Sequence, residues 1–251
     1  MIVGGPEREA NWLNLAPDAT HMMFRQYIAD DRVQKLYDIT VERIDEPESL
    51  PTAAEMQEEL AEKLTNASGF IRHMAEPYIK ISRGTLARPN EMLPLSPEAR
   101  GALGANSANA YWLGSWDLDE TEALLIEFTP VPAEYWSLVA HNTWIQALPQ
   151  TQMQMQLNML EASRDEDGKV RFVVSHSDPG YANWLSTGDL RRGFLALRVT
   201  NKQGEENVAA HKVTLDELAA EMPDNSPMVS SDERRLAVET KRRQILTRYG
   251  R

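Results

Sequence analysis

The densest group of chemically capable side chains lies between residues 176 and 187, where a histidine, a carboxylate, an amide and an indole surround a Pro-Gly pair. Pro179 fixes φ at the first central position of a turn and Gly180 tolerates a positive φ at the second, which predicts a type II turn. A turn at the end of a strand can hold several polar side chains over one point. This segment is therefore the first candidate site.

His176 and Asp178 are two residues apart, so on a regular strand both would face the same side. A histidine beside a carboxylate can act as a general base with its orienting partner, or the two can bind a metal. We predict that His176 and Asp178 are the catalytic pair. In the structural alternative, Asp178 accepts backbone N–H groups of the turn and His176 satisfies a buried carbonyl.

Four further side chains extend the predicted substrate site. Asn183 and Trp184 would present an amide and an aromatic platform, although Asn183 could equally cap the turn and Trp184 could belong to the core. Asn142 and Trp144 lie on one face of a second polar and aromatic cluster that begins at His141. We predict that these four residues bind substrate.

Arg25 and Arg198 complete the predicted binding set, since each lies in an apolar run where an unpaired charge is costly. One interpretation is an ion pair with Glu42, Glu127 or Asp178. The other is a guanidinium that binds a carboxylate, sulfate or phosphate of the substrate.

No cofactor or metal is predicted. The sequence has no Gly-x-Gly-x-x-Gly, phosphate-binding loop or Gly-x-Ser-x-Gly, which argues against nucleotide binding and the common serine hydrolases. His141 and His176 could contribute to a metal site only across strands, because no short His-x-His or His-x-x-x-His spacing is present.

In the run from 151 to 158, polar residues, mostly glutamine, alternate with apolar residues, mostly methionine, from Gln152 onward. Alternation predicts a strand with its methionine face in the core. The glutamine face either meets solvent or lines a polar pocket.

The elements that must position these residues follow from hydrophobic periodicity. Near-alternation predicts strands at 22–28 and 36–44, and helical spacing predicts a helix over 49–82, bent or broken at Gly69 and Pro77. A loop is expected over about 84–110. Strands are then predicted at 111–118, 123–129, 135–144, 153–160, 170–175 and 194–200.

Turn and capping signals complete the element assignment. Asp167-Gly168 predicts a hairpin between the strands 153–160 and 170–175. Capping boxes at Thr214–Glu217 and Ser230–Glu233 predict two C-terminal helices. The expected fold is mainly β with α: an antiparallel, jelly-roll-like β-sandwich with a helical segment after the first strands and two C-terminal helices.

Three regions are expected to form one compact unit. Residues 1–110 would contribute strands and a helical segment, residues 111–212 the sandwich core, and residues 213–251 a helical tail. Residues 232–251 carry seven basic and three acidic residues, so the tail is +4 and the remainder −16 out of a net −12. We expect this basic tail to dock on the acidic body of its own chain or of a neighbouring subunit, and the acidic body disfavours nucleic acid.

The composition also bounds the setting of the protein. The chain has no cysteine, no apolar run long enough to cross a membrane and no visible signal peptide. We predict a cytoplasmic protein that associates with neither membranes nor nucleic acid.

Four segments together resemble the bacterial family known as domain of unknown function 1214. The most specific is His176-x-Asp-Pro-Gly-x-x-Asn-Trp-Leu, and the resemblance spans about residues 11 to 250. The supporting segments are Phe24–Tyr27 after Asn-Trp-Leu, Leu113–Asp117 before the strand 123–128, and Glu134–Ser137 with Asn142 and Trp144. The resemblance implies a jelly-roll-like β-sandwich with helical additions, relatives that are longer at the N-terminus, and a weak link to carbohydrates.

Two functions are therefore carried forward. The first is an enzyme of bacterial small-molecule or carbohydrate-related metabolism, a hydrolase or lyase that uses His176 and Asp178 on a polar or cyclic substrate. The alternative is a noncatalytic module that binds a small ligand or assembles as a homo-oligomer.

Overall fold

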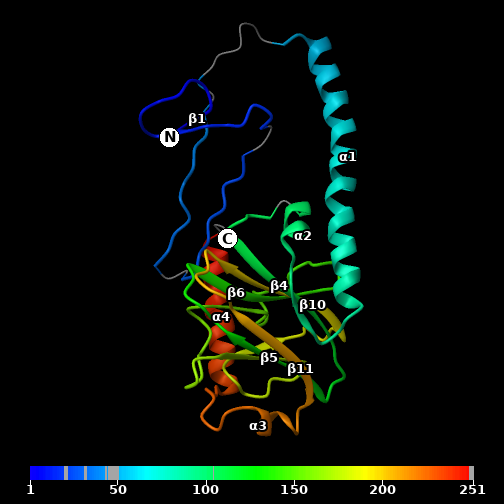
Figure 1. Cartoon of the computed structure of the whole chain (residues 1–251), viewed down its shortest axis with the longest axis vertical. Coiled ribbons are helices and arrows are strands. Elements are labelled where there is room, and N and C mark those ends of the chain that lie inside the picture. The colour runs from blue at the N-terminus through cyan, green and yellow to red at the C-terminus, as the bar shows by residue number, and fades with distance from the viewer. Residues whose placement is uncertain (20–21, 31–32, 43, 45–50, 104, 249–251) are drawn as a thin grey trace.

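The protein is described here by a computed structural model, which covers the chain except residues 20–21, 31–32, 43, 45–50, 104 and 249–251. Its centre is a pair of β-sheets (Figure 1). The five-stranded sheet has the order β3 (Met92–Pro94), β4 (Asn109–Asp117), β10 (Arg192–Thr200), β6 (Tyr135–His141) and β7 (Gln156–Asn158). The four-stranded sheet has the order β11 (Asn207–Thr214), β5 (Glu122–Thr129), β8 (Val170–Ser175) and β9 (Trp184–Ser186).

The two sheets pack face to face over one apolar core. Trp136 of β6 meets Phe128 of β5 and Phe172 of β8 edge to face, with ring centroids 5.2 and 6.3 Å apart. Alternate residues of each strand enter this core, as a sandwich requires. The mainly-β fold with antiparallel sheets is confirmed, and the one parallel pair within these two sheets is β8 with β9.

The strand predictions hold best inside the sandwich. The run 170–175 matches β8, and the four predicted strands 111–118, 123–129, 135–144 and 194–200 match β4, β5, β6 and β10 within three residues. The predicted strand 135–144 ends early because Asn142 turns the chain: its Oδ1 accepts the N–H groups of Trp144 and Gln146. The predicted strand 153–160 shortens to β7, and β3, β9 and β11 were not predicted.

The predicted hairpin at Asp167-Gly168 is wrong. The turn itself forms, with Gly168 at φ +79° and its N–H bonded to the Asp165 carbonyl. However, β7 pairs with β6 in one sheet, whereas β8 pairs with β5 in the other. A turn signal reports local backbone shape and does not determine which strands pair.

The predicted strands at 22–28 and 36–44 are also wrong, because none of their described residues lies in a sheet. These segments touch through Gln26, whose side chain bonds the backbone of Tyr37. Most of the apolar residues of 36–44 are exposed, so their alternating side chains are not buried against a sheet. Near the N-terminus, β1 (Ile2–Val3) and β2 (Trp12–Leu13) instead form a short parallel pair.

The helix α1 spans Ala53–Leu86 and begins with a capping box between Thr52 and Glu55. It continues through Gly69 and Pro77, so the predicted break is wrong. Its C-terminal turns are held on the sandwich, because Ser82 Oγ donates to the Thr143 carbonyl at 2.6 Å. Figure 1 shows the N-terminal half extending beyond the sheets. The loop expected over 84–110 holds the end of α1, then β3 and α2 (Pro97–Ala102).

Two helices follow the sandwich as predicted: α3 (Leu218–Glu221) and α4 (Ser231–Arg248). The Ser230–Glu233 capping box starts α4. The Thr214–Glu217 bonds also form, but they close the turn that precedes α3. Among the described helices, none combines the length and apolar composition needed to cross a membrane.

Candidate functional site

Within the segment 176–187, Gly180 has the positive φ of +88° that the predicted turn requires. Its histidine is bound on both ring nitrogens: Nε2 lies 3.1 Å from the Leu118 carbonyl and Nδ1 lies 2.8 Å from the Thr187 hydroxyl. Because a carbonyl only accepts, Nε2 carries the proton, and in the neutral ring Nδ1 then accepts from Thr187. His176 therefore joins the end of β8 to two neighbouring segments.

Asp178 turns away from His176 and binds elsewhere. Its Oδ1 accepts the Gly180 N–H at 2.9 Å, and its Oδ2 accepts Arg234 Nε at 2.9 Å. The predicted catalytic pair is therefore not brought into contact. His176 borders an open hollow with Asp119, Asp189 and Arg191. In the described chain, no group of three or more histidine and acidic side chains is placed to hold a metal ion.

Arg234 of α4 contacts several of the residues in the segment 176–187 that was predicted from sequence. Its side chain is 9% exposed and pairs with Asp178, while its terminal nitrogens donate to the carbonyls of Tyr181 and Ala182. The guanidinium also lies over the Trp184 ring, 5.4 Å from the centroid. Trp184 itself is buried and donates to Ser175. The predicted loop thus anchors α4.

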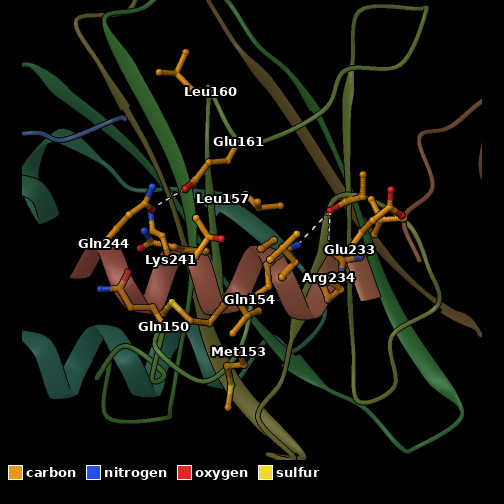
Figure 2. A pocket seen from close by; sticks show the side chains of 18 of the residues that line it. Gln150, Met153, Gln154, Leu157, Leu160, Glu161, Glu233, Arg234, Lys241 and Gln244 are labelled. Atoms are coloured by element: carbon orange, nitrogen blue, oxygen red, sulfur yellow. Dashed lines mark hydrogen bonds and ion pairs between the residues drawn. The ribbon is translucent and has the colours of Figure 1, made fainter. Parts of the chain in front are cut away.

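A pocket of about 560 Å³ lies between α4 and the segment 150–163 (Figure 2). This volume is within the range of small-molecule sites. Its lining combines amides, methionine and leucine side chains, and a few charged groups. We take this pocket as the candidate site.

Three glutamines give the pocket unused hydrogen-bonding capacity. Gln150, Gln156 and Gln244 are half-buried, and their side chains make no hydrogen bond to any described residue. Gln154 differs, because its amide donates to the carbonyls of Ala182 and Trp184 and fixes the pocket wall. Of the two alternatives for the glutamine face of 151–158, the pocket lining is the one that Gln154 and Gln156 adopt.

The charged groups of this pocket are largely paired with one another or with the chain. Lys241 of α4 binds Glu161 at 2.7 Å, as Figure 2 shows, and Glu233 accepts from the Ser230 hydroxyl and N–H. Arg234 is paired with Asp178. The expected docking of the basic tail on the acidic body is thus observed within one chain.

The remaining predicted residues of the loops are structural or exposed. Asn183 bonds both backbone groups of Ser163 at 2.8 Å and so fixes one edge of the pocket. Asn142 closes its own turn, and Trp144 is 79% exposed. Arg25 is exposed and lies outside any strand. None of these four side chains lines the pocket.

Arg198 lies on the outer face of the five-stranded sheet, with its guanidinium 5.2 Å from the centre of the Tyr111 ring. Its Nε is buried and lacks a hydrogen-bond partner, and no described carboxylate pairs with it. The expected partners are engaged elsewhere, since Glu127 binds Arg171 and Asp178 binds Arg234. The predicted ion pair of Arg198 is therefore absent from the described residues.

Arg234, Gln150 and Gln244 were not predicted as site residues. The capping box and basic charge of the last helix were visible in the sequence. These features do not specify which face of the sandwich the helix covers. The pocket forms where α4 docks on that face.

Comparisons with known proteins agree with this fold. Residues 105–203 match the family described as "Protein of unknown function (DUF1214)", which confirms the resemblance over that segment. An uncharacterised protein from Burkholderia cenocepacia has a crystal structure with a TM-score of 0.76 and 23% identity, covering 85% of this chain and 59% of that one. This chain thus spans 59% of that protein, and the likeness shows the fold alone.

A second solved structure, from Vibrio parahaemolyticus, has a TM-score of 0.32 and 16% identity, covering 65% of this chain and 47% of the other. Its similarity is too low to support an argument. No curated protein matches the sequence.

Proposed function

We propose the function of this chain from its own pocket, because the family whose model matches residues 105–203 is itself described as of unknown function. We infer that the protein binds a neutral, hydroxyl-rich small molecule between α4 and the segment 150–163, without transforming it. This is the binding module that the sequence analysis carried as its alternative. Several expectations from the sequence stay predictions: a cytoplasmic location, a bacterial origin, jelly-roll connectivity, a homo-oligomeric state and no binding to nucleic acid.

The observation that carries this proposal is the set of free amides on Gln150, Gln156 and Gln244. Each amide has two donors and an accepting oxygen, and a ligand that covered these groups without bonding them would leave them unsatisfied at a cost. The three side chains come from the segment before β7, from β7 and from α4. A ligand with several hydroxyl or carbonyl groups would satisfy them together.

The rest of the lining restricts the ligand to a neutral molecule with an apolar face. Arg234, Lys241 and Glu233 are already paired, so a charged ligand gains no free counter-charge from them. Met153, Leu157 and Leu160 supply apolar contact surface. A monosaccharide or a small glycoside has this combination of hydroxyl groups and an apolar ring face.

Binding without catalysis is favoured because Glu161 and Glu233, two carboxylates that line the pocket, are already bound to Lys241 and to Ser230. General base catalysis requires a proton acceptor within hydrogen-bond reach of the substrate. His176 lies outside the pocket with both ring nitrogens bonded, and Asp178 is held by Arg234. The predicted acid-base pair would have to leave both sets of partners to act.

The test is calorimetric titration with a panel of neutral mono- and disaccharides, together with their phosphorylated and sulfated forms. A neutral member of the panel should bind. Replacing the free amides in Gln156→Ala and Gln244→Leu should weaken its affinity by about tenfold or more each, which corresponds to about 1.4 kcal/mol. These side chains make no internal hydrogen bond, so the fold should persist.

Gln152→Ala is the matched control, because Gln152 is exposed in the same segment but does not line the pocket. Its affinity should equal that of the unmodified protein. The proposal fails if no neutral member binds, or if affinity follows the anionic charge of the sugar. It also fails if the control weakens binding as much as the pocket variants.

A further inference from the structure

The N-terminal half of α1 presents a long apolar surface to solvent. Met56, Leu60, Leu64 and Ile71 are between 57% and 66% exposed, and the anchored contacts of α1 lie near its C-terminal end. An isolated exposed leucine is common, but a continuous stripe along one helix face marks an interaction surface. This surface plays no part in the pocket at α4.

The stripe has the spacing of a coiled-coil seam. Its members Leu60, Leu64, Ala67, Ile71, Met74 and Tyr78 follow one another by four, three, four, three and four residues. A 4-3 repeat keeps apolar side chains on the line where two helices supercoil. The positions that follow three of these seam residues are small: Ala61, Ser68 and Ala75. A second helix can therefore approach closely.

The seam is also symmetric about residue 69. Reversing its direction leaves the spacing unchanged, so an antiparallel copy of α1 would form six layers, two of each of three kinds. These layers pair Leu60 with Tyr78, Leu64 with Met74, and Ala67 with Ile71 of the other copy. Each layer pairs one kind of seam position with the other, as antiparallel coiled coils require.

Charge favours the same arrangement. Residues 53–69 contain four glutamates and one lysine, a net −3. Residues 70–86 contain Arg72, Lys80 and Arg83 with one glutamate, a net +2. An antiparallel pair places each acidic half beside a basic half, whereas a parallel pair places like charges together.

We propose that α1 is the dimerisation element of this protein, pairing antiparallel with α1 of a second copy through the seam from Leu60 to Tyr78. The repeat, its symmetry and the charge of the two halves all identify a second copy of the same helix as the occupant. Association would cover side chains that are otherwise exposed along these six layers.

The first test is the particle mass of the full chain by light scattering coupled to size exclusion. The expected mass is twice the 28.4 kDa of one chain. Leu64→Glu/Ile71→Glu places four like charges at the centre of the seam and should give a monomer. Both side chains are exposed, at 65% and 66%, so the variant should keep the near-ultraviolet circular dichroism of the folded sandwich.

The second test uses the absence of native cysteine to determine the orientation. The variant Leu60→Cys/Tyr78→Cys should form a disulfide-linked dimer on mild oxidation, because the two positions meet in the antiparallel pair. Leu60→Cys alone should not, since the two copies of this residue would be about 27 Å apart along the helix. That same separation prevents a bond within one helix.

Each alternative has its own outcome. A monomeric full chain overturns the proposal and leaves the stripe to a different protein. Dimers that survive Leu64→Glu/Ile71→Glu place the interface elsewhere. Efficient cross-linking of Leu60→Cys alone would show a parallel pair and overturn the antiparallel arrangement.

Discussion

His141 ends β6 on the outer face of the five-stranded sheet, where its ring packs edge to face on Phe194 with centroids 6.0 Å apart. Burial lowers the pKa of this imidazole below its usual 6.5, and the positive charge of Arg198 lowers it further. The nearby backbone of Val139 and Phe194 opposes the pKa shift but does not cancel it. Its Nδ1 is buried without a partner, which also suits the neutral ring.

This pKa shift predicts a loss of stability in weak acid. With the folded pKa below 6.5, the unfolded chain binds the proton more readily, so the contribution of His141 is complete above that value and is lost as pH falls below it. In His141→Gln, the urea midpoint should change less between about pH 7.5 and about pH 5.5 than in the unmodified protein.

His73→Gln is the control for this measurement, because His73 is exposed on α1. It should keep the pH dependence of the unmodified protein. An equal pH dependence in His141→Gln and the unmodified protein would show that His141 does not contribute.

At the scale of elements, the docking of α4 depends on one buried cation. Arg234 connects the helix to Asp178 and to the carbonyls of Tyr181 and Ala182, all in the turn after β8. The helix and the turn therefore stabilise each other, and together they form one side of the pocket. The polar residues of the turn are thus explained by anchoring.

Removing this cation should release α4. In Arg234→Met, Asp178, whose side chain is 26% exposed, loses its partner and two carbonyls lose their donor, a change expected to cost about 1–3 kcal/mol. Amide hydrogen exchange in Ser231–Arg248 should accelerate strongly, while the strands of the sandwich should keep their protection.

Arg235→Met is the matched control on the next residue. The Arg235 side chain is 71% exposed and pairs only with Asp232 among the described residues. The free energy of opening measured by amide exchange in α4 should therefore change by less than about 0.5 kcal/mol. If the two variants behave alike, the buried anchor is not what holds the helix.

At the scale of the whole molecule, stability depends on close packing between the sheets and within each sheet. Gly193 of β10 lies opposite Trp116 of β4, and that indole is fully buried. A Cβ at residue 193 would collide with the Trp116 ring and would lie 2.7 Å from the His141 carbonyl. The glycine thus provides the space that the tryptophan fills.

Gly193→Ala should therefore destabilise the sandwich. Overpacking a filled core typically costs about 1–3 kcal/mol, and here both the ring and a backbone carbonyl resist movement. Urea unfolding followed by tryptophan fluorescence should show a lower midpoint with an unchanged slope.

Gly101→Ala gives the comparison, because a Cβ at residue 101 of α2 meets no atom within 4 Å. It should be neutral or stabilising by about 0.5–1 kcal/mol, since alanine favours a helix. A Gly193→Ala protein as stable as this control would show that Trp116 can shift at no cost.

The amino-acid sequence determined the features that depend on neighbouring residues. The run 170–175, the turn at Pro179-Gly180 and the capping box at Ser230 were all predictable, because periodicity and capping involve residues within a few positions. The alternation of apolar residues in 36–44 gave a wrong strand prediction. A strand also needs a neighbouring strand to pair with, and the local sequence does not specify that neighbour.

The tertiary structure decided how the candidate site is assembled. The spacing of two between His176 and Asp178 implies a shared face only on a strand, and β8 ends at Ser175, one residue before the pair. Asp178 instead meets Arg234, which is 56 positions away in the sequence. The pocket likewise joins β7 to α4. Contacts between such distant segments depend on how the sheets and helices pack, which no local pattern of residues specifies.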